Sequence, residues 1–451
     1  MRRAADSPRR SLTSSSTWPV PVLAAAMALL AAAPLDAATV RLRGGGQPVA
    51  AERVDLELAG VRVVKAGVTS FIAWDQVQAI EDRPLSAAER GQLATATDLW
   101  RARSRVQRGD EALAVELFQK HFTTFRGTTS ETALVVAEGL LRCRLASGLR
   151  ADRVKAIVAA IEVARLRRAK VTTDRYAGLV PVIDEATLLC PYLGPDLAPA
   201  LATLGTGGER PGVIDPESEA VAAEIDRTFP DSAATGVDGE TLRTARLYAA
   251  FLRGGAGPAP ARRDEGGLAL LAAMVELGRA ATTAPTGDAA ATSTVETRTR
   301  HRAAALAAAK ALPGWAAGWA HFAVGRSLVA EQEPARRVDG VLELLEVAAI
   351  ERQVPTALVN QALLLGLVSL RSSGDAASAA VIERELAGRG VAAPSATNRN
   401  ARGATSANRS AQPTAPASDT PTARPAEPAP DAPAPPAAAP PVPSGSAPST
   451  P

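Results

Sequence analysis

The densest group of side chains that could take part in binding lies between positions 315 and 322. Trp315, Trp319 and Phe322 recur at helical spacing with His321 beside them, although aromatic residues make up only 3% of the chain. Side chains three and four positions apart share one face of a helix, so the aromatic residues are expected to line one surface. Two interpretations follow: a packing seam inside the protein, or an aromatic recognition pocket with His321 at its rim. The second makes these four residues a candidate interaction patch.

The two cysteines, Cys143 and Cys190, are the next candidates. Both lie in apolar sequence of helical character, LLRCRL and ATLLCPY. In an oxidising compartment they could form a disulfide across about fifty residues, worth about 4 kcal/mol on the chain-entropy model. Alternatively, each is a free thiol that packs as a small hydrophobic group. Neither has a second thiol or a histidine at ligand spacing, so we predict no metal site.

Motifs of known catalytic chemistry are missing from the sequence. It has no G-x-S-x-G, no Walker A loop, no H-E-x-x-H, no C-x-x-C and no dinucleotide-binding glycine pattern. The histidines fall in separate predicted helices: His121, His301 and His321. Two pairs of carboxylates lie on predicted amphipathic helices, where such pairs usually face solvent: Asp184 with Glu185, and Glu343 with Glu346. We therefore predict no catalytic residue and no cofactor, and an enzyme is the less favoured class.

Residues 1–37 have the order of a signal peptide. Four arginines within the first ten residues precede an apolar run at residues 19–33, and a small residue follows at position 37. The apolar run is shorter than the roughly 20 residues that cross a bilayer as a helix. We therefore predict an exported protein, periplasmic or secreted, with no transmembrane span after signal cleavage. The alternative is an uncleaved N-terminal anchor.

The formal net charge of +3 lies at the two ends of the chain. Residues 1–37 carry +2 and the residues from 390 onward carry +1, so the body between them is close to neutral. Nucleic-acid binding needs clustered cations that neutralise several phosphates. The nearest approach to such a cluster is expected on a solvated helix face: Arg165, Arg167, Arg168 and Lys170. We predict other polypeptides of the envelope as partners and no nucleic acid.

Residues 38–83 alternate between apolar and polar types and predict a small antiparallel β module. Strands are expected at residues 39–43, 54–58, 61–64 and 70–74, and the glycines at 44–46 form a turn. The expected inward face comprises Val40, Leu42, Val54, Leu56, Leu58, Val61, Val63, Phe71 and Ile72. The pattern Trp74-Asp75-Gln76-Val77 with Ile80 resembles the small SH3-like β units at the start of some exported bacterial proteins.

From residue 84 the apolar period becomes that of helices. Helices are predicted at residues 86–108, 110–125, 133–145, 150–170, 184–190, 217–229, 240–252, 267–277, 295–312, 317–329, 337–351, 356–370 and 377–386. A linker at 254–267, rich in Gly and Pro, is expected to divide this body into two parts, 84–253 and 268–389. The predicted fold class is therefore mostly α, a helical-hairpin or solenoid-like array behind the small β module.

Two segments of the helical body carry a Gly-Asp turn. Gly109-Asp110, followed by Ala114 and Phe118, has the residue types of the turn and second helix of a tetratricopeptide repeat, and Gly374-Asp375 opens a second partial match. His121 departs from the pattern, because the repeat prefers a small residue there. The chain thus resembles a degenerate tetratricopeptide-repeat protein. The resemblance implies stacked helical hairpins whose surface binds other polypeptides.

Residues 390–451 are rich in Pro and Ala and contain no aromatic residue. Such a segment cannot bury enough apolar area to offset its ordering entropy, so we predict a disordered tail. Together with the export signal and the missing catalytic motifs, this organisation predicts a non-enzymatic interaction or scaffold protein of the cell envelope. The alternative is an extracytoplasmic hydrolase or lyase that uses carboxylates of the helical body.

Overall fold

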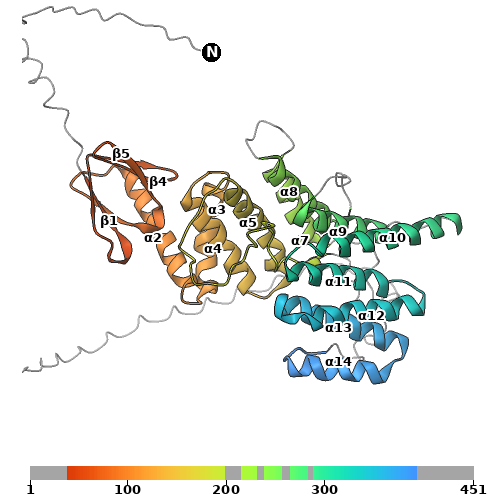
Figure 1. Ribbon diagram of the computed structural model, residues 1–451. Coiled ribbons are helices and arrows are strands. Elements are labelled where there is room, and N and C mark those ends of the chain that lie inside the picture. Colours follow the sequence, from red (N-terminus) through yellow and green to blue (C-terminus); the bar gives the residue numbers. More distant parts are fainter. Residues whose placement is uncertain (1–37, 199–214, 231–237, 256–264, 283–287, 394–451) are drawn as a thin grey trace, which may run out of the picture. The chain divides into compact units, whose positions relative to one another are not determined.

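The computed structural model describes residues 38–198, 215–230, 238–255, 265–282 and 288–393 (Figure 1). The predicted signal peptide at 1–37 and residues 394–451 of the predicted tail lie outside these ranges. Within them the chain begins with a small antiparallel β unit and continues as helices. The predicted fold class is therefore confirmed for the described residues.

Between residues 38 and 81, all of which are described, six strands form the β unit. They are β1 (Ala38–Leu42), β2 (Val49–Ala51), β3 (Arg53–Glu57), β4 (Gly60–Lys65), β5 (Val68–Ile72) and β6 (Val77–Glu81). They make two antiparallel sheets, ordered β2-β1-β6 and β3-β4-β5. Only four strands were expected. β2 is too short to show alternation, and the buried residues of β6, Val77 and Ile80, are three positions apart.

The predicted inward face of the β unit is correct only in part. Five of its members are buried: Val40, Val54, Val61, Val63 and Ile72. Leu42 and Leu56 are partly buried, but Leu58 and Phe71 are exposed. Neighbouring residues of a strand point to opposite faces, so Phe71 cannot point inward together with Ile72. Leu58 lies beyond the end of β3, in the turn that leads to β4.

Twelve α-helices lie within the described residues. They are α2 (Ala87–Val106), α3 (Glu111–Phe125), α4 (Glu131–Ala146), α5 (Arg150–Arg168), α7 (Pro216–Thr228), α8 (Gly239–Leu252), α9 (Gly266–Thr282), α10 (Asp288–Ala309), α11 (Gly314–Val329), α12 (Pro334–Ala349), α13 (Thr356–Ser373) and α14 (Ala376–Gly388). Each packs against the next helix along the chain (Figure 1). The packing is therefore that of a helical array.

One predicted helix, at residues 184–190, does not form. The Asp184 carboxylate accepts hydrogen bonds from the backbone N–H of Thr187 at 2.8 Å and from its hydroxyl at 2.7 Å. Leu188 has a φ of 56°, in the left-handed region. The left-handed Leu188 and the following Pro191 stop the turn that begins at Asp184 from continuing as a helix, which explains the difference.

The two Gly-Asp segments separate pairs of packed helices. Gly109 lies between α2 and α3 with a φ of 81°, and Gly374 ends α13 with a φ of 82°. Glycine adopts this left-handed conformation without the steric cost that a Cβ would add. Asp375 then caps α14 by accepting from the backbone N–H of Ser378 at 3.0 Å. Both Gly-Asp segments therefore serve as hairpin turns.

The β unit is joined to the helices through Trp74 and Asp75, which precede β6. The backbone N–H of Trp74 donates to the Thr132 hydroxyl of α4 at 3.1 Å. The buried Asp75 carboxylate pairs with Arg103 of α2 at 2.8 Å and with Arg175 at 3.4 Å. The small core of the β unit is thereby extended by the helices that follow, as its size requires.

The predicted linker at 254–267 lies between helices that share one core. α8 and α9, on either side of it, pack together, and the Gly255 carbonyl accepts from Arg279 Nε at 3.0 Å. One cluster of buried apolar residues extends from Ala38 to Leu386. Residues 256–264 are outside the described ranges. Helices on both sides of the predicted linker therefore contribute to one buried core.

Candidate functional site

The aromatic residues singled out in the sequence lie on α11 and are buried. Trp319 and Phe322 have no exposed surface, Trp315 has almost none, and the two indole rings meet edge to face at 5.0 Å. The Trp319 indole N–H donates to the Pro191 carbonyl at 3.0 Å. These side chains therefore form a packing seam, the first of the two interpretations, and of the candidate patch only His321 reaches the surface.

The seam on α11 holds the segment 191–197 against α5. Arg326 of α11 donates to the Pro195 carbonyl at 3.1 Å, and Asp196 pairs with Arg153 of α5 at 2.6 Å. All three charged side chains are buried. Burial raises the pKa of Asp196 and lowers the pKa of Arg326 to about 10. The Asp196 carboxylate thus compensates part of the charge of the two guanidinium groups, and these contacts fix the segment between the two helices.

His321 is the partly exposed member of the aromatic group. Its Nδ1 lies 2.7 Å from the carboxylate of Glu343 on α12. The hydrogen bond to Glu343 raises the pKa of His321, the charge of Glu346 adds to the rise, and burial opposes it. The pair therefore links α11 and α12 most strongly when the imidazole is protonated.

We expect a His321→Gln variant to lose stability relative to the parent protein on the acid side only. Because the folded pKa is raised, the contribution is fully present below the unfolded value of about 6.5 and is lost as pH rises through the folded pKa. The free energy of unfolding of both proteins at about pH 5.5 and about pH 8.5 checks this. His301→Gln is the control. Because burial lowers the pKa of His301, this variant should gain stability relative to the parent on the acid side. A deficit equal at both pH values would contradict the expectation.

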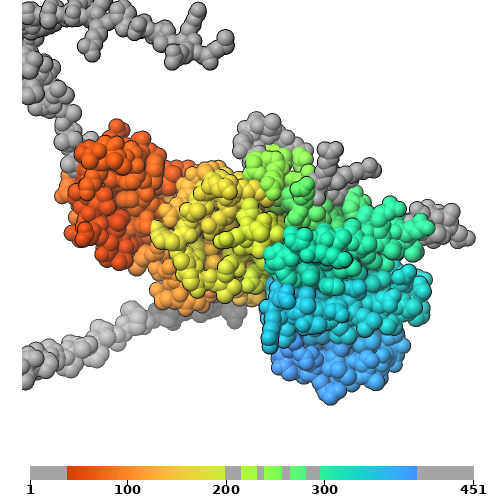
Figure 2. All heavy atoms as spheres, in the orientation of Figure 1, coloured from red at the N-terminus to blue at the C-terminus, as the bar shows by residue number. Residues whose placement is uncertain are grey.

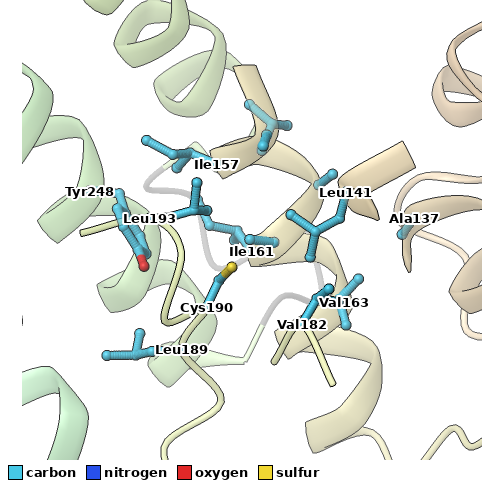
Figure 3. Close-up of a cluster of buried hydrophobic side chains, with 14 of the residues drawn as sticks. Ala137, Leu141, Ile157, Ile161, Val163, Val182, Leu189, Cys190, Leu193 and Tyr248 are labelled. Atoms are coloured by element: carbon cyan, nitrogen blue, oxygen red, sulfur yellow. The ribbon is translucent and has the colours of Figure 1, made fainter. Parts of the chain in front are cut away.

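Both cysteines are buried free thiols. Burial raises the pKa of Cys143 and of Cys190 to about 12. Figure 3 shows Cys190 in a cluster of apolar side chains that includes Ile161, Leu193 and Tyr248. The thiols therefore pack as small hydrophobic groups, the second of the two interpretations, and neither has the low pKa of a reactive cysteine.

An apolar groove lies among the C-terminal helices α12, α13 and α14, which are blue in Figure 2. Its volume is about 560 Å³. α12 contributes Val338 and Leu342, each 57% exposed, and the partly exposed Leu345. Val381 of α14, 56% exposed, lines the groove with them. Four large apolar side chains are therefore gathered at one uncovered surface, which we call the α12–α14 groove.

The α12–α14 groove exists because α12 is apolar on two faces. Its buried face packs on the neighbouring helices: Val341, Leu344 and Val347. A second stripe, Val338, Leu342 and Leu345, has helical spacings of four and three and stays exposed. A surface helix with one covered face is normally polar on the other side. The wide apolar arc of α12 can be recognised in the sequence. Val338, Leu342 and Leu345 were nevertheless not predicted as site residues.

Several polar groups at the groove are already hydrogen-bonded. The hydroxyls of Ser372 and Ser373 donate to carbonyls of their own helix at 2.7 and 2.9 Å. Arg337 donates to the Gln332 carbonyl at 2.8 Å, and Asp375, the N-cap of α14, accepts from the backbone N–H of Ser378. The groove therefore offers apolar contact and small side chains that permit close approach.

A second hollow, of about 810 Å³, has a charged lining that includes Arg167, Lys170 and Glu138. Arg167 pairs with Glu138 at 3.1 Å. Arg165, expected on the same solvated face, is instead buried beside Glu162 at 2.8 Å. The expectation of a solvated cation cluster is wrong for Arg165, because an ion pair within α5 compensates its burial.

One member of each carboxylate pair noted in the sequence has a structural partner. Asp184 closes the turn at Thr187, and Glu343 binds His321. Within the ranges that the structure covers, no group of three or more His, Cys, Asp or Glu residues is placed to hold a metal ion. Among the described residues, no helix is both long enough and apolar enough to cross a membrane.

Comparisons of the chain with protein-family models, with curated proteins and with solved structures found no match. The class that the fold defines is a mostly α helical array with an N-terminal β unit. The uncovered α12–α14 groove is its candidate site.

Proposed function

We propose that the protein is a non-enzymatic interaction protein of the cell envelope, which holds an amphipathic helix of a partner polypeptide in the α12–α14 groove. The observation that carries the proposal is the exposed stripe of Val338, Leu342 and Leu345 facing Val381. The signal-like residues 1–37 and the likeness to helical repeats support the same class. The alternative hydrolase finds no support in Asp184 or Glu343, whose carboxylates bind neighbouring residues.

A helix is the occupant that fits the spacing of the stripe. Val338, Leu342 and Leu345 span eight residues of α12, seven helical steps or about 10 Å along its axis. Side chains spaced by three and four form ridges that pack between the ridges of a second helix. A partner helix with apolar anchors at i, i+4 and i+7 would cover the stripe and keep its polar side in water.

The chain's own tail lacks the residues to fill the groove. Between positions 394 and 451 the only Val, Leu, Ile, Met or aromatic residue is Val442, which lies between prolines. Helix-in-groove binding relies on large apolar anchors, and proline interrupts a helix. The occupant is therefore a separate polypeptide.

The test uses an amphipathic peptide of about 18 residues, long enough to be helical, with leucines at i, i+4, i+7 and i+11. We expect the mature protein to bind the labelled peptide, measured by fluorescence anisotropy, and a Leu342→Glu variant to bind at least about tenfold more weakly because a charge would enter the apolar contact. Leu113→Glu is the matched control, since Leu113 is exposed on α3 outside the groove.

Both replaced leucines are exposed, so the variants should keep the melting temperature of the parent protein. Hydrogen exchange should show protection of α12 when the peptide is bound. Equal affinity of the Leu342→Glu variant and the parent would overturn the proposal, as would binding without protection of α12. Competition of a second copy of the chain with the peptide would assign the groove to self-association instead.

A further inference from the structure

Three of the four sheet edges in the β unit, residues 38–81, are protected against further strands. β2 is short and follows Pro48. β3 carries Arg53, Asp55 and Glu57 along its length, and β6 packs against α2. Short strands, charges, proline and covering helices are the means by which natural proteins block exposed edges. Only the fourth edge is therefore left open to pairing with a further strand.

That edge is β5, and none of these devices protects it. Its sequence, V-T-S-F-I, has no charge, no proline and no glycine. Its register with β4 continues without a bulge from Val68 to Ile72, and within the described residues it pairs with β4 alone. Val68 is 67% exposed and Phe71 57%. The outer backbone groups of β5 are thus open to a further strand, beside exposed apolar side chains.

We propose that this edge binds the β5 strand of a second copy of the chain, antiparallel, with the two-fold axis at Ser70. In that register Val68 lies opposite Ile72 of the second copy, and Thr69 lies opposite Phe71. Apolar pairs and pairs of a β-branched with an aromatic residue are those that stabilise neighbouring strands. The strand is complementary to itself and sets no like charges against each other, as a two-fold interface requires.

β4 places two cations beside β5: Lys65, the exposed last residue of the strand, opposite Val68, and Arg62, opposite Phe71. Arg62 of β4, the cross-strand neighbour of Phe71, already pairs with Asp55 and with Glu57, each at 2.8 Å. A second β5 strand paired beside Phe71 therefore meets a guanidinium group whose charge is already compensated, while Lys65 lies at the end of the paired segment. Five residue pairs form a small contact, so the dimer should be weak and dependent on concentration.

Sedimentation velocity of the mature chain tests the proposal over about 1 to about 500 μM, the range suited to a small interface. We expect monomers at the lower end and dimers at the upper end. Ser70→Lys and Ser70→Glu each set like charges together at the axis, so each should dimerise at least about tenfold more weakly. An equimolar mixture of the two should recover the dimer. Ala50→Lys, in the protected edge β2, is the matched control and should behave as the parent.

A cysteine cross-link identifies the contact. Under mild oxidation the Ser70→Cys variant should form a disulfide-linked dimer, whereas the buried Cys143 and Cys190 should not react. A parent chain that stays monomeric throughout, or an undiminished dimer of Ser70→Lys, would overturn the proposal. So would the failure of the mixed variants to associate. Leu342→Glu should dimerise as the parent does, which separates this edge from the α12–α14 groove.

Discussion

The Asp196→Ala variant should unfold with a free energy about 3–5 kcal/mol below that of the parent protein. Asp196 is buried 2.6 Å from Arg153, and the nearby Arg326 is buried as well. Burial already lowers the pKa of Arg326 to about 10 in the presence of the Asp196 charge. Without the carboxylate both guanidinium groups remain in the interior uncompensated. Urea denaturation followed by circular dichroism measures the loss.

Asp226→Ala is the matched control for this experiment. Asp226 pairs with Arg253 at 2.8 Å on the surface, and about half of its side chain is exposed. Exposed pairs contribute at most about 1 kcal/mol, because water and salt screen them. Equal losses for the two variants would show that the segment 191–197 is not held by its buried charges.

The Trp74→Ala variant should lose about 3–5 kcal/mol of unfolding free energy, the usual cost of truncating a buried aromatic residue. The Trp74 ring is buried, and its indole N–H donates to the Leu58 carbonyl at 3.1 Å. Its backbone N–H donates to Thr132 of α4. Truncation leaves a cavity where the β unit meets the helices. Hydrogen exchange should therefore rise at the start of α4 as well as in the β unit.

Trp100→Ala is the comparison. Trp100 is partly exposed on α2, and the Arg43 guanidinium lies 4.6 Å from its ring centroid. An exposed cation–π contact is worth about 0.5–1 kcal/mol, so this variant should lose much less stability than Trp74→Ala. Similar losses would mean that Trp74 does not join the two parts of the protein.

Most helices could be predicted from the sequence because their apolar residues recur at three and four positions over several turns. Twelve of the thirteen predicted helices form, with ends displaced by a few residues. The failure at 184–190 has a local cause, the left-handed conformation of Leu188 followed by Pro191. β2 and β6 were not predicted, because their sequences do not alternate between apolar and polar residues. They are strands because each pairs with β1.

The candidate patch on α11 shows the limit of periodicity. The spacing of Trp315, Trp319 and Phe322 places them on one face but does not say whether that face is covered. The covering segment contains Pro191, 128 positions before Trp319. No local pattern links two segments so far apart.

The sequence by itself determined the helical periods, the hairpin turns at Gly109 and Gly374, the neutral charge of the body and the apolar run at residues 19–33. Only the tertiary structure decided that α11 is covered while the stripe of α12 and the edge of β5 are not. The physical reason is that spacing sets which side chains share a face, whereas burial depends on which other element packs there. Both proposed contacts arise at surfaces that the described residues of this chain leave unpaired.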